Sequence, residues 1–68
     1  MEKDWSLLYT TDKIYESEML KDFLLSKNIK SIAINKQDSS YKSFGEVEIY
    51  VSNRDLNDAK KFLKQFQA

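Results

Sequence analysis

One segment decides how this 68-residue chain folds: Gly45-Glu46-Val47-Glu48-Ile49-Tyr50-Val51. Its aliphatic residues alternate with glutamate and tyrosine, which is the period of a strand that buries one face and exposes the other. Residues 29–35, upstream of it, also alternate but carry apolar side chains in both sets, as in a strand that is partly covered on its second face. The two segments predict an antiparallel hairpin joined by residues 36–44.

A further strand and a helix precede this hairpin. Residues 5–9, Trp-Ser-Leu-Leu-Tyr, are short and apolar enough for a largely buried strand. Thr11 or Asp12 is expected to cap the helix that follows, and Asn28 is expected to end it in a left-handed conformation. The buried stripe of this helix is predicted to contain Ile14, Ser17, Leu20 and Leu24, with Met19 and Phe23 beside it.

A second helix is predicted after the last strand. Ser52, followed three residues later by Asp55, resembles a capping box. The buried stripe of this helix is predicted to contain Leu56, Ala59, Phe62, Leu63 and Phe66. Lys60, Lys61 and Lys64 fall on the outer face, which is more typical of a solvated surface than of a nucleic-acid contact.

The predicted order is β-α-β-β-α, and the handedness of crossover connections limits its topology. A right-handed crossover makes the first two strands parallel, and the hairpin makes the third strand antiparallel to the second. We therefore expect an α+β fold: a three-stranded mixed sheet with the third strand in the middle and both helices on one face. This is a ferredoxin-like half-sandwich that lacks the fourth strand.

The composition excludes several classes of function. The chain has neither cysteine nor histidine, which excludes thiolate and histidine metal sites and the common nucleophile–histidine pairs. Its formal net charge is zero, which disfavours nucleic-acid binding. Without an apolar run long enough for a signal peptide or a membrane span, residues 1–68 are expected to form a single cytoplasmic domain. We expect a protein that is not an enzyme and needs no cofactor.

In this predicted fold the first strand lies at an unpaired edge of the sheet. Residues 5–10 would form a sheet edge that carries no proline and no inward-pointing charge, and such an edge invites pairing with a second copy or with another protein. The face of the third strand opposite its aliphatic residues offers a second surface. The interface candidates are therefore Trp5, Leu7, Tyr9, Glu46, Glu48 and Tyr50.

Several segments of the chain form a recognisable set: Trp5 with Tyr9-Thr10-Thr11, residues 15–18, Leu24 with Asn28-Ile29, the distinctive residues 35–41 (Asn-Lys-Gln-Asp-Ser-Ser-Tyr), residues 45–51, and Ala59. In these segments the chain resembles a small prokaryotic family, DUF2007, in its Bacteroidetes-type form. The resemblance implies a bacterial protein with a fold similar to the nitrogen-regulatory PII proteins. It also implies a role in signal transduction, but it names no ligand.

The loop at 36–44 is longer than a hairpin requires and is rich in polar groups. Its candidate contact residues for a ligand or partner are Lys36, Gln37, Asp38, Ser39, Ser40 and Tyr41. Two hypotheses follow. The first is an interaction or regulatory module that forms a homodimer or binds another protein. The second is a sensor of a nucleotide or anionic metabolite that works through this loop, although the loop side chains can equally satisfy their own backbone in local turns.

Overall fold

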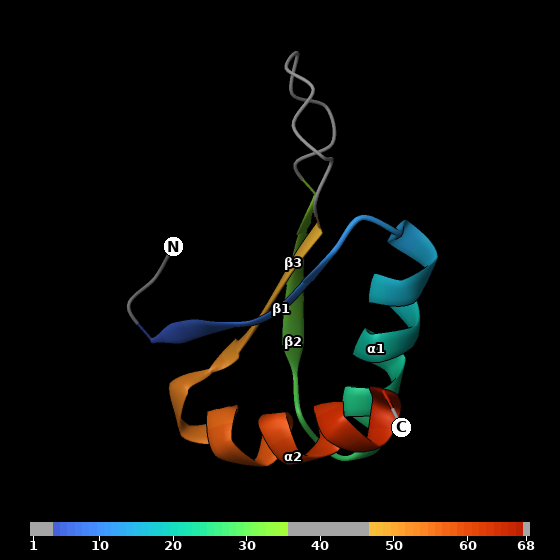
Figure 1. Cartoon of the computed structure of the whole chain (residues 1–68). Helices are drawn as coiled ribbons and strands as arrows, with labels where there is room; N and C mark the ends of the chain where they lie inside the picture. Colours follow the sequence, from blue (N-terminus) through green and yellow to red (C-terminus); the bar gives the residue numbers. More distant parts are fainter. Residues whose placement is uncertain (1–3, 36–46, 68) are drawn as a thin grey trace.

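The fold is α+β, as the sequence predicts, with a three-stranded sheet and two helices. A computed structural model describes residues 4–35 and 47–67 of the chain (Figure 1). The strands are β1 (Trp5–Thr11), β2 (Ser31–Asn35) and β3 (Val47–Ser52). The helices are α1 (Ile14–Ser26) and α2 (Leu56–Gln67), and the short 3₁₀ turn η1 (Asn53–Asp55) leads from β3 into α2.

The sheet is antiparallel between all neighbours, so the prediction of a mixed sheet is wrong. Its strand order is β1-β3-β2, and β3 pairs antiparallel with both other strands. β1 and β2 do run in the same direction, as the crossover rule requires. Because β3 lies between them, that parallel relation never becomes a hydrogen-bonded pair.

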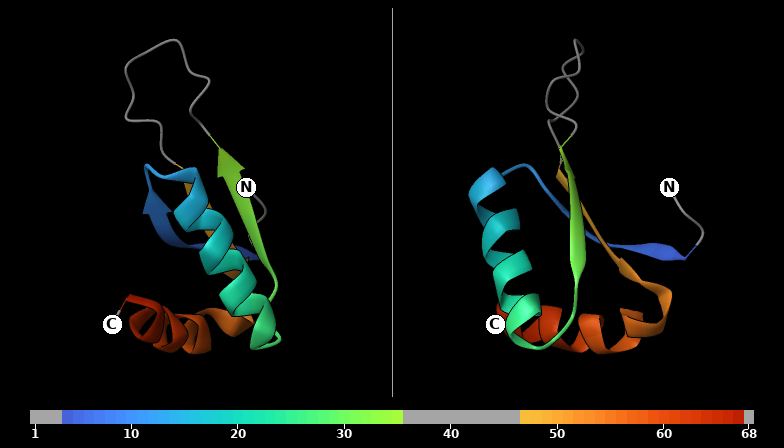
Figure 2. Two further views of the ribbon diagram at one scale, coloured as in Figure 1. Left: turned by 90° about the vertical axis from the view of Figure 1, so that its right-hand side faces the viewer. Right: turned by 180° about the vertical axis from the view of Figure 1, so that it is seen from behind.

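Both helices pack on the same face of this sheet. The fully buried core joins Leu20 and Leu24 of α1, Ala59 of α2 and Ile29 to the inward residues of β3, which are Val47, Ile49 and Val51. Figure 2 shows α1 lying along the sheet and α2 crossing one end of it. Phe23 links the two helices through ring contacts with Phe62 and Phe66, at 6.5 and 5.7 Å between centroids.

The first helix departs from its predicted pattern at its start. Ile14 and Met19 are 46% and 56% exposed, so neither belongs to the buried stripe, whereas Ser17, Leu20 and Leu24 do. Ser17 is buried because it is small and because its hydroxyl donates a hydrogen bond to the Ile14 carbonyl at 2.7 Å. The predicted end is confirmed, since Asn28 has a φ of 66°, in the left-handed region that asparagine tolerates.

Neither helical segment has the predicted side-chain cap. Lys13 occupies the cap position of α1 without a side-chain hydrogen bond, because Thr11 is still part of β1, opposite Val47. Ser52 does occupy the N-cap position of η1, as predicted, but it makes no side-chain capping bond, so the capping box with Asp55 is wrong. The stripe of α2 is confirmed: Ala59 is buried and Leu56, Phe62, Leu63 and Phe66 pack against the core.

Candidate functional site: the open face of the sheet

The strand register separates the sheet into two faces. Residues that pair across strands share a face, so the partners of Val47, Ile49 and Val51 lie on the side of the helices. The partners of Glu48, Tyr50 and Ser52 lie on the opposite side, which neither α1 nor α2 covers. We call this side the open face; it carries Trp5, Leu7, Thr10, Ile32, Ile34, Glu48, Tyr50 and Ser52.

The open face is mainly apolar, which differs from the polar face that β3 alone predicts. Its middle row consists of Leu7, Tyr50 and Ile32, one from each strand. Leu7 is 49% and Ile32 is 36% exposed, while Trp5, Ile34 and Tyr50 are half-buried. The glutamates of the third strand indicated a solvated face, but the neighbouring strands contribute large apolar side chains beside them.

A bulge in β1 decides which of its residues reach the open face. Leu7 pairs with Tyr50 and Tyr9 pairs with the adjacent Ile49, so Leu8 is an extra residue in the ladder. Trp5 and Leu7 therefore lie on the open face together with Thr10, whereas Tyr9 lies on the helix side. Of the interface candidates in the first strand, the structure thus brings Trp5 and Leu7 together and separates Tyr9 from them.

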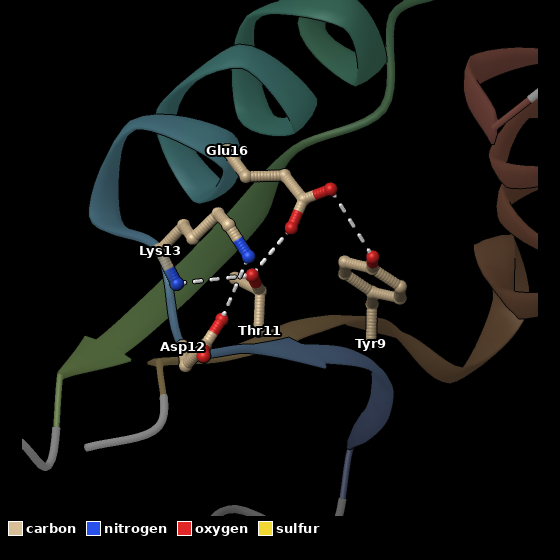
Figure 3. A network of polar contacts seen from close by, with 5 residues as sticks. All are labelled: Tyr9, Thr11, Asp12, Lys13 and Glu16. Carbon is tan, nitrogen blue, oxygen red and sulfur yellow. Dashed lines mark hydrogen bonds and ion pairs between the residues drawn. The ribbon is translucent and has the colours of Figure 1, made fainter. Parts of the chain in front are cut away.

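Tyr9 instead belongs to a polar network at the junction of β1 and α1 (Figure 3). Its hydroxyl donates to one carboxylate oxygen of Glu16 at 3.4 Å, and the hydroxyl of Thr11 donates to the other. The Thr11 oxygen also accepts the backbone N–H of Lys13 at 3.1 Å. Glu16 thereby ties the end of the strand to the first turn of the helix, a role that the sequence pattern did not indicate because it predicted Thr11 or Asp12 as a helix cap.

The Lys13 side chain completes this corner from the solvent side. Its ammonium lies 3.3 Å from the carboxylate of Asp12, and this hydrogen bond raises the pKa of Lys13 above its ordinary value of 10.5. Both side chains are more than half exposed, so water screens the pair and its contribution to stability is small.

One end of the open face carries a carboxylate. Glu48 lies in a row with Thr10 and Ile34, and it accepts a hydrogen bond from the hydroxyl of Tyr50 at 2.9 Å. This bond, together with partial desolvation, raises the pKa of Tyr50 above its ordinary value of 10.0. The row Thr10–Glu48–Ile34 is called the acidic end below.

The other end of the open face carries charges of both signs. Trp5 pairs with Ser52 there, and both line a shallow hollow of about 340 Å³ together with Asn28, Lys30, Arg54 and Asp55. A second hollow of about 450 Å³ shares Trp5, Ser52 and Arg54 and adds Asp4 and Asn53. Two cations and two carboxylates therefore line the hollows at this end, and their formal charges balance.

The remaining candidates lie outside the described residues. These are Lys36, Gln37, Asp38, Ser39, Ser40 and Tyr41 of the hairpin loop, together with Glu46. The ligand-sensor hypothesis that rests on the loop therefore stays a prediction. In the part of the chain that the structure describes, no cluster of three acidic side chains is arranged to hold a metal ion. Neither α1 nor α2 has the length and apolar character needed to cross a bilayer.

Comparison with known proteins assigns a family to this arrangement. Residues 5–67 match the model of a family described as "Putative prokaryotic signal transducing protein". The chain belongs to the DUF2007 family. The match spans all the described strands and both helices of this DUF2007 chain, so the open face is part of the shared domain. No curated protein and no solved structure matches it.

Proposed function

We propose that this DUF2007 chain is a small, non-enzymatic regulatory module of the bacterial cytoplasm that works by self-association through its open face. The observation that carries the proposal is the apolar middle row of that face, Leu7–Tyr50–Ile32, which no described helix covers. Apolar patches left open on one side of a sheet are typical of interaction surfaces. A role in regulation follows the family description.

The size of the domain favours a second copy as the partner. Its described core contains seven fully or nearly fully buried apolar side chains, and domains near this length gain much from burying further surface by oligomerisation. The zero net charge also means that two copies do not repel each other as a whole.

The open face is a better candidate for this contact than the edge of β1. The bulge at Leu8 interrupts the hydrogen-bonding pattern of β1, and bulges are one of the devices by which proteins make edge strands poor templates for pairing. In contrast, the middle row of the open face is continuous across all three strands. We therefore assign self-association to the face, and include the ferredoxin-like, PII-like half-sandwich in the proposal on the strength of the strand order β1-β3-β2.

The expected dimer is weak. The described face has three rows, of which two span all three strands and one, Trp5–Ser52, spans two; this is smaller than the ~800 Å² that each partner buries in a standard interface. We therefore expect dissociation constants on the order of micromolar or weaker, so that dilution separates the copies.

Sedimentation equilibrium over a wide concentration range tests the proposal. The parent chain is compared with Leu7→Lys on the open face and with Met19→Lys, which places the same charge on an exposed apolar position of α1. We expect the parent and Met19→Lys to dimerise alike and Leu7→Lys to remain monomeric. Circular dichroism checks that each variant is folded.

Two outcomes would contradict the proposal. One is a parent chain that stays monomeric up to roughly millimolar concentration, where even weak complexes form. The other is a folded Leu7→Lys variant that dimerises as the parent does, since a lysine in the middle row cannot be buried against a second apolar face without a large desolvation cost.

A further inference from the structure

The edge of the sheet opposite β1 is formed by β2, and it lacks the features that protect an edge strand. Among the described residues β2 pairs only with β3, and no bulge interrupts that pairing. Its residues Ser31–Asn35 include neither proline nor a charged side chain. Bulges, prolines and charges are the devices that keep edge strands from pairing with another chain. β2 is therefore a better template for strand pairing than β1, whose ladder is interrupted at Leu8.

α1 runs alongside β2 in the opposite direction (Figure 2). Between them, a shallow hollow of about 350 Å³ is lined by Lys21, Asp22 and Leu25 of α1 and by Lys30 and Ser31 at the start of β2. Leu25 is a large apolar side chain, yet it is 60% exposed. The hollow therefore marks the side of α1 that lies next to the β2 edge.

Four residues of α1 share that side, Ile14, Glu18, Lys21 and Leu25, and we call them the α1 flank. Their spacing of four, three and four residues follows one side of an α-helix. Ile14 is 46% exposed, and Glu18 is exposed as well. Along the flank the order is apolar, acidic, basic, apolar. A second copy laid against it in the opposite direction therefore matches apolar with apolar residues and each charge with its opposite.

We propose that two copies pair through their β2 edges, antiparallel about a twofold axis, with their α1 flanks packed against each other. Ile14 then lies against Leu25 of the partner subunit, and Glu18 lies against Lys21 of the partner subunit, each contact occurring twice. This contact goes beyond the proposed function, because it joins two sheets side by side. It leaves both open faces uncovered and on the same side of the joined sheet.

The strand and the helix place this twofold axis at the same level. The hollow sets Ser31 level with the turn of α1 between Lys21 and Leu25. The middle of the α1 flank lies about 5 Å from that turn toward the start of the helix, at ~1.5 Å per residue. The same distance along β2, at ~3.3 Å per residue, leads to Ile32 and Ala33. An axis beside these two residues therefore passes through the middle of both β2 and the α1 flank.

The spacing across the axis agrees as well. α1 packs against both β2 and β3, which places it above the gap between two strands that are ~4.8 Å apart. The twofold axis lies half a strand spacing outside β2. Each α1 helix is then about 5 Å from the axis, so the two helices lie about 10 Å apart, a usual distance for packed helices.

This edge contact is weaker than the open-face contact. Its strand pairing and its ion pairs replace bonds to water, so each gives a small net gain, whereas the open-face contact buries apolar side chains. A Leu7→Lys chain is therefore monomeric at concentrations where the parent dimerises, and it pairs through β2 only at higher concentration.

Disulfide cross-linking tests the contact, since the chain has no cysteine of its own. Ile14→Cys and Leu25→Cys, both at exposed positions, are equilibrated in a glutathione buffer alone and as a mixture at high concentration. In the proposed pair, position 14 meets position 25 of the other copy, whereas two positions 14 are about 16 Å apart along the helices. We expect the mixture to give at least roughly fivefold more cross-linked dimer than either variant alone, because a disulfide needs Cα atoms within ~7 Å.

Charge swaps supply a second readout with a matched control. Glu18→Lys and Lys21→Glu are introduced singly and together into both cysteine variants. Each single change places like charges opposite each other at two symmetric positions. We expect the cross-linked yield to fall roughly fivefold for either single change and to recover to within about twofold in the double variant. Asp58→Lys and Lys61→Glu, with the same spacing on exposed positions of α2, should leave the yield unchanged.

The outcomes separate this inference from the proposed function. A mixture that cross-links no better than the separate variants overturns the β2 edge contact, whatever Leu7→Lys does to the dimer. Single charge changes without effect on the yield overturn the packing of the α1 flanks. Mixed cross-linking that falls with each single change and recovers in the double variant supports the inference. A Leu7→Lys chain that dimerises as the parent does overturns the proposed function alone.

Discussion

The two faces of this sheet are built from the same strands, yet they differ in what surrounds them. On the helix side, Val47, Ile49 and Val51 are almost fully buried under α1 and α2. On the open face, Leu7 and Ile32 are of similar chemistry but stay 49% and 36% exposed. The difference shows that apolar side chains of this sheet have two environments: those on one face hold the monomer together, and those on the other form the surface that we propose for self-association.

The largest difference in unfolding free energy between the two faces is expected when an isoleucine on each face is replaced by alanine. Ile49→Ala removes a fully buried side chain and leaves a cavity, which costs about 2–5 kcal/mol of unfolding free energy. Ile32→Ala removes a partly exposed one and should cost the dilute monomer less than about 1 kcal/mol. Urea denaturation at low protein concentration measures both. Equal costs would mean that the open face is as much part of the monomer core as the helix side.

A smaller difference in stability is expected when valine replaces one or the other of two adjacent threonines. Thr11 is buried, accepts the Lys13 N–H and donates to Glu16, so Thr11→Val leaves polar groups unpaired and should cost about 1–2 kcal/mol. Thr10 lies on the exposed acidic end, where Thr10→Val should be neutral within about 0.5 kcal/mol. Thermal unfolding compares the two variants with the parent. A cost at Thr10 as large as that at Thr11 would contradict the assigned register.

The smallest expected effect is a shift in the pH at which Tyr50, on the open face, ionises. Because its hydroxyl donates to Glu48, its pKa in the folded protein lies above the ordinary 10.0. The hydrogen bond from Tyr50 to Glu48 stabilises the folded protein fully when the pH is below the ordinary pKa of tyrosine. This stabilisation is lost as the pH rises through the raised pKa of Tyr50. The ultraviolet difference titration of the parent against Tyr50→Phe gives the midpoint. Glu48→Gln should lower that midpoint; an unchanged value would show that Glu48 is not its cause.

The sequence predicted those parts of the fold that depend on local pattern. The alternation at residues 47–51, the stripe of α2 and the left-handed Asn28 each follow from side chains close in sequence, and each is confirmed. The mixed sheet was wrong because β3, in the middle as predicted, separates the two strands that run in the same direction. The expected capping bonds were wrong because they depend on what lies beside a residue. Thr11 is paired with Val47 in β1, and Ser52 stands at the N-cap position of η1 without a side-chain capping bond.

The composition of the open face was harder to predict for the same reason. β3 alone shows Glu48 and Tyr50 and indicates a polar surface, and only the cross-strand register brings Leu7 and Ile32 beside them. Strict alternation places Tyr9 on the same face as Trp5 and Leu7, but the bulge moves it to the helix side. No local signal in Trp-Ser-Leu-Leu-Tyr marks Leu8 as the extra residue.

That extra residue divides β1 into two parts. Because Leu8 changes the phase of the strand, the side chains before and after it face different environments. Substitutions at positions 5 and 7 change the open face, while Tyr9 and Thr11 continue to hold the junction with α1. The two parts of this seven-residue strand can therefore be altered independently of each other.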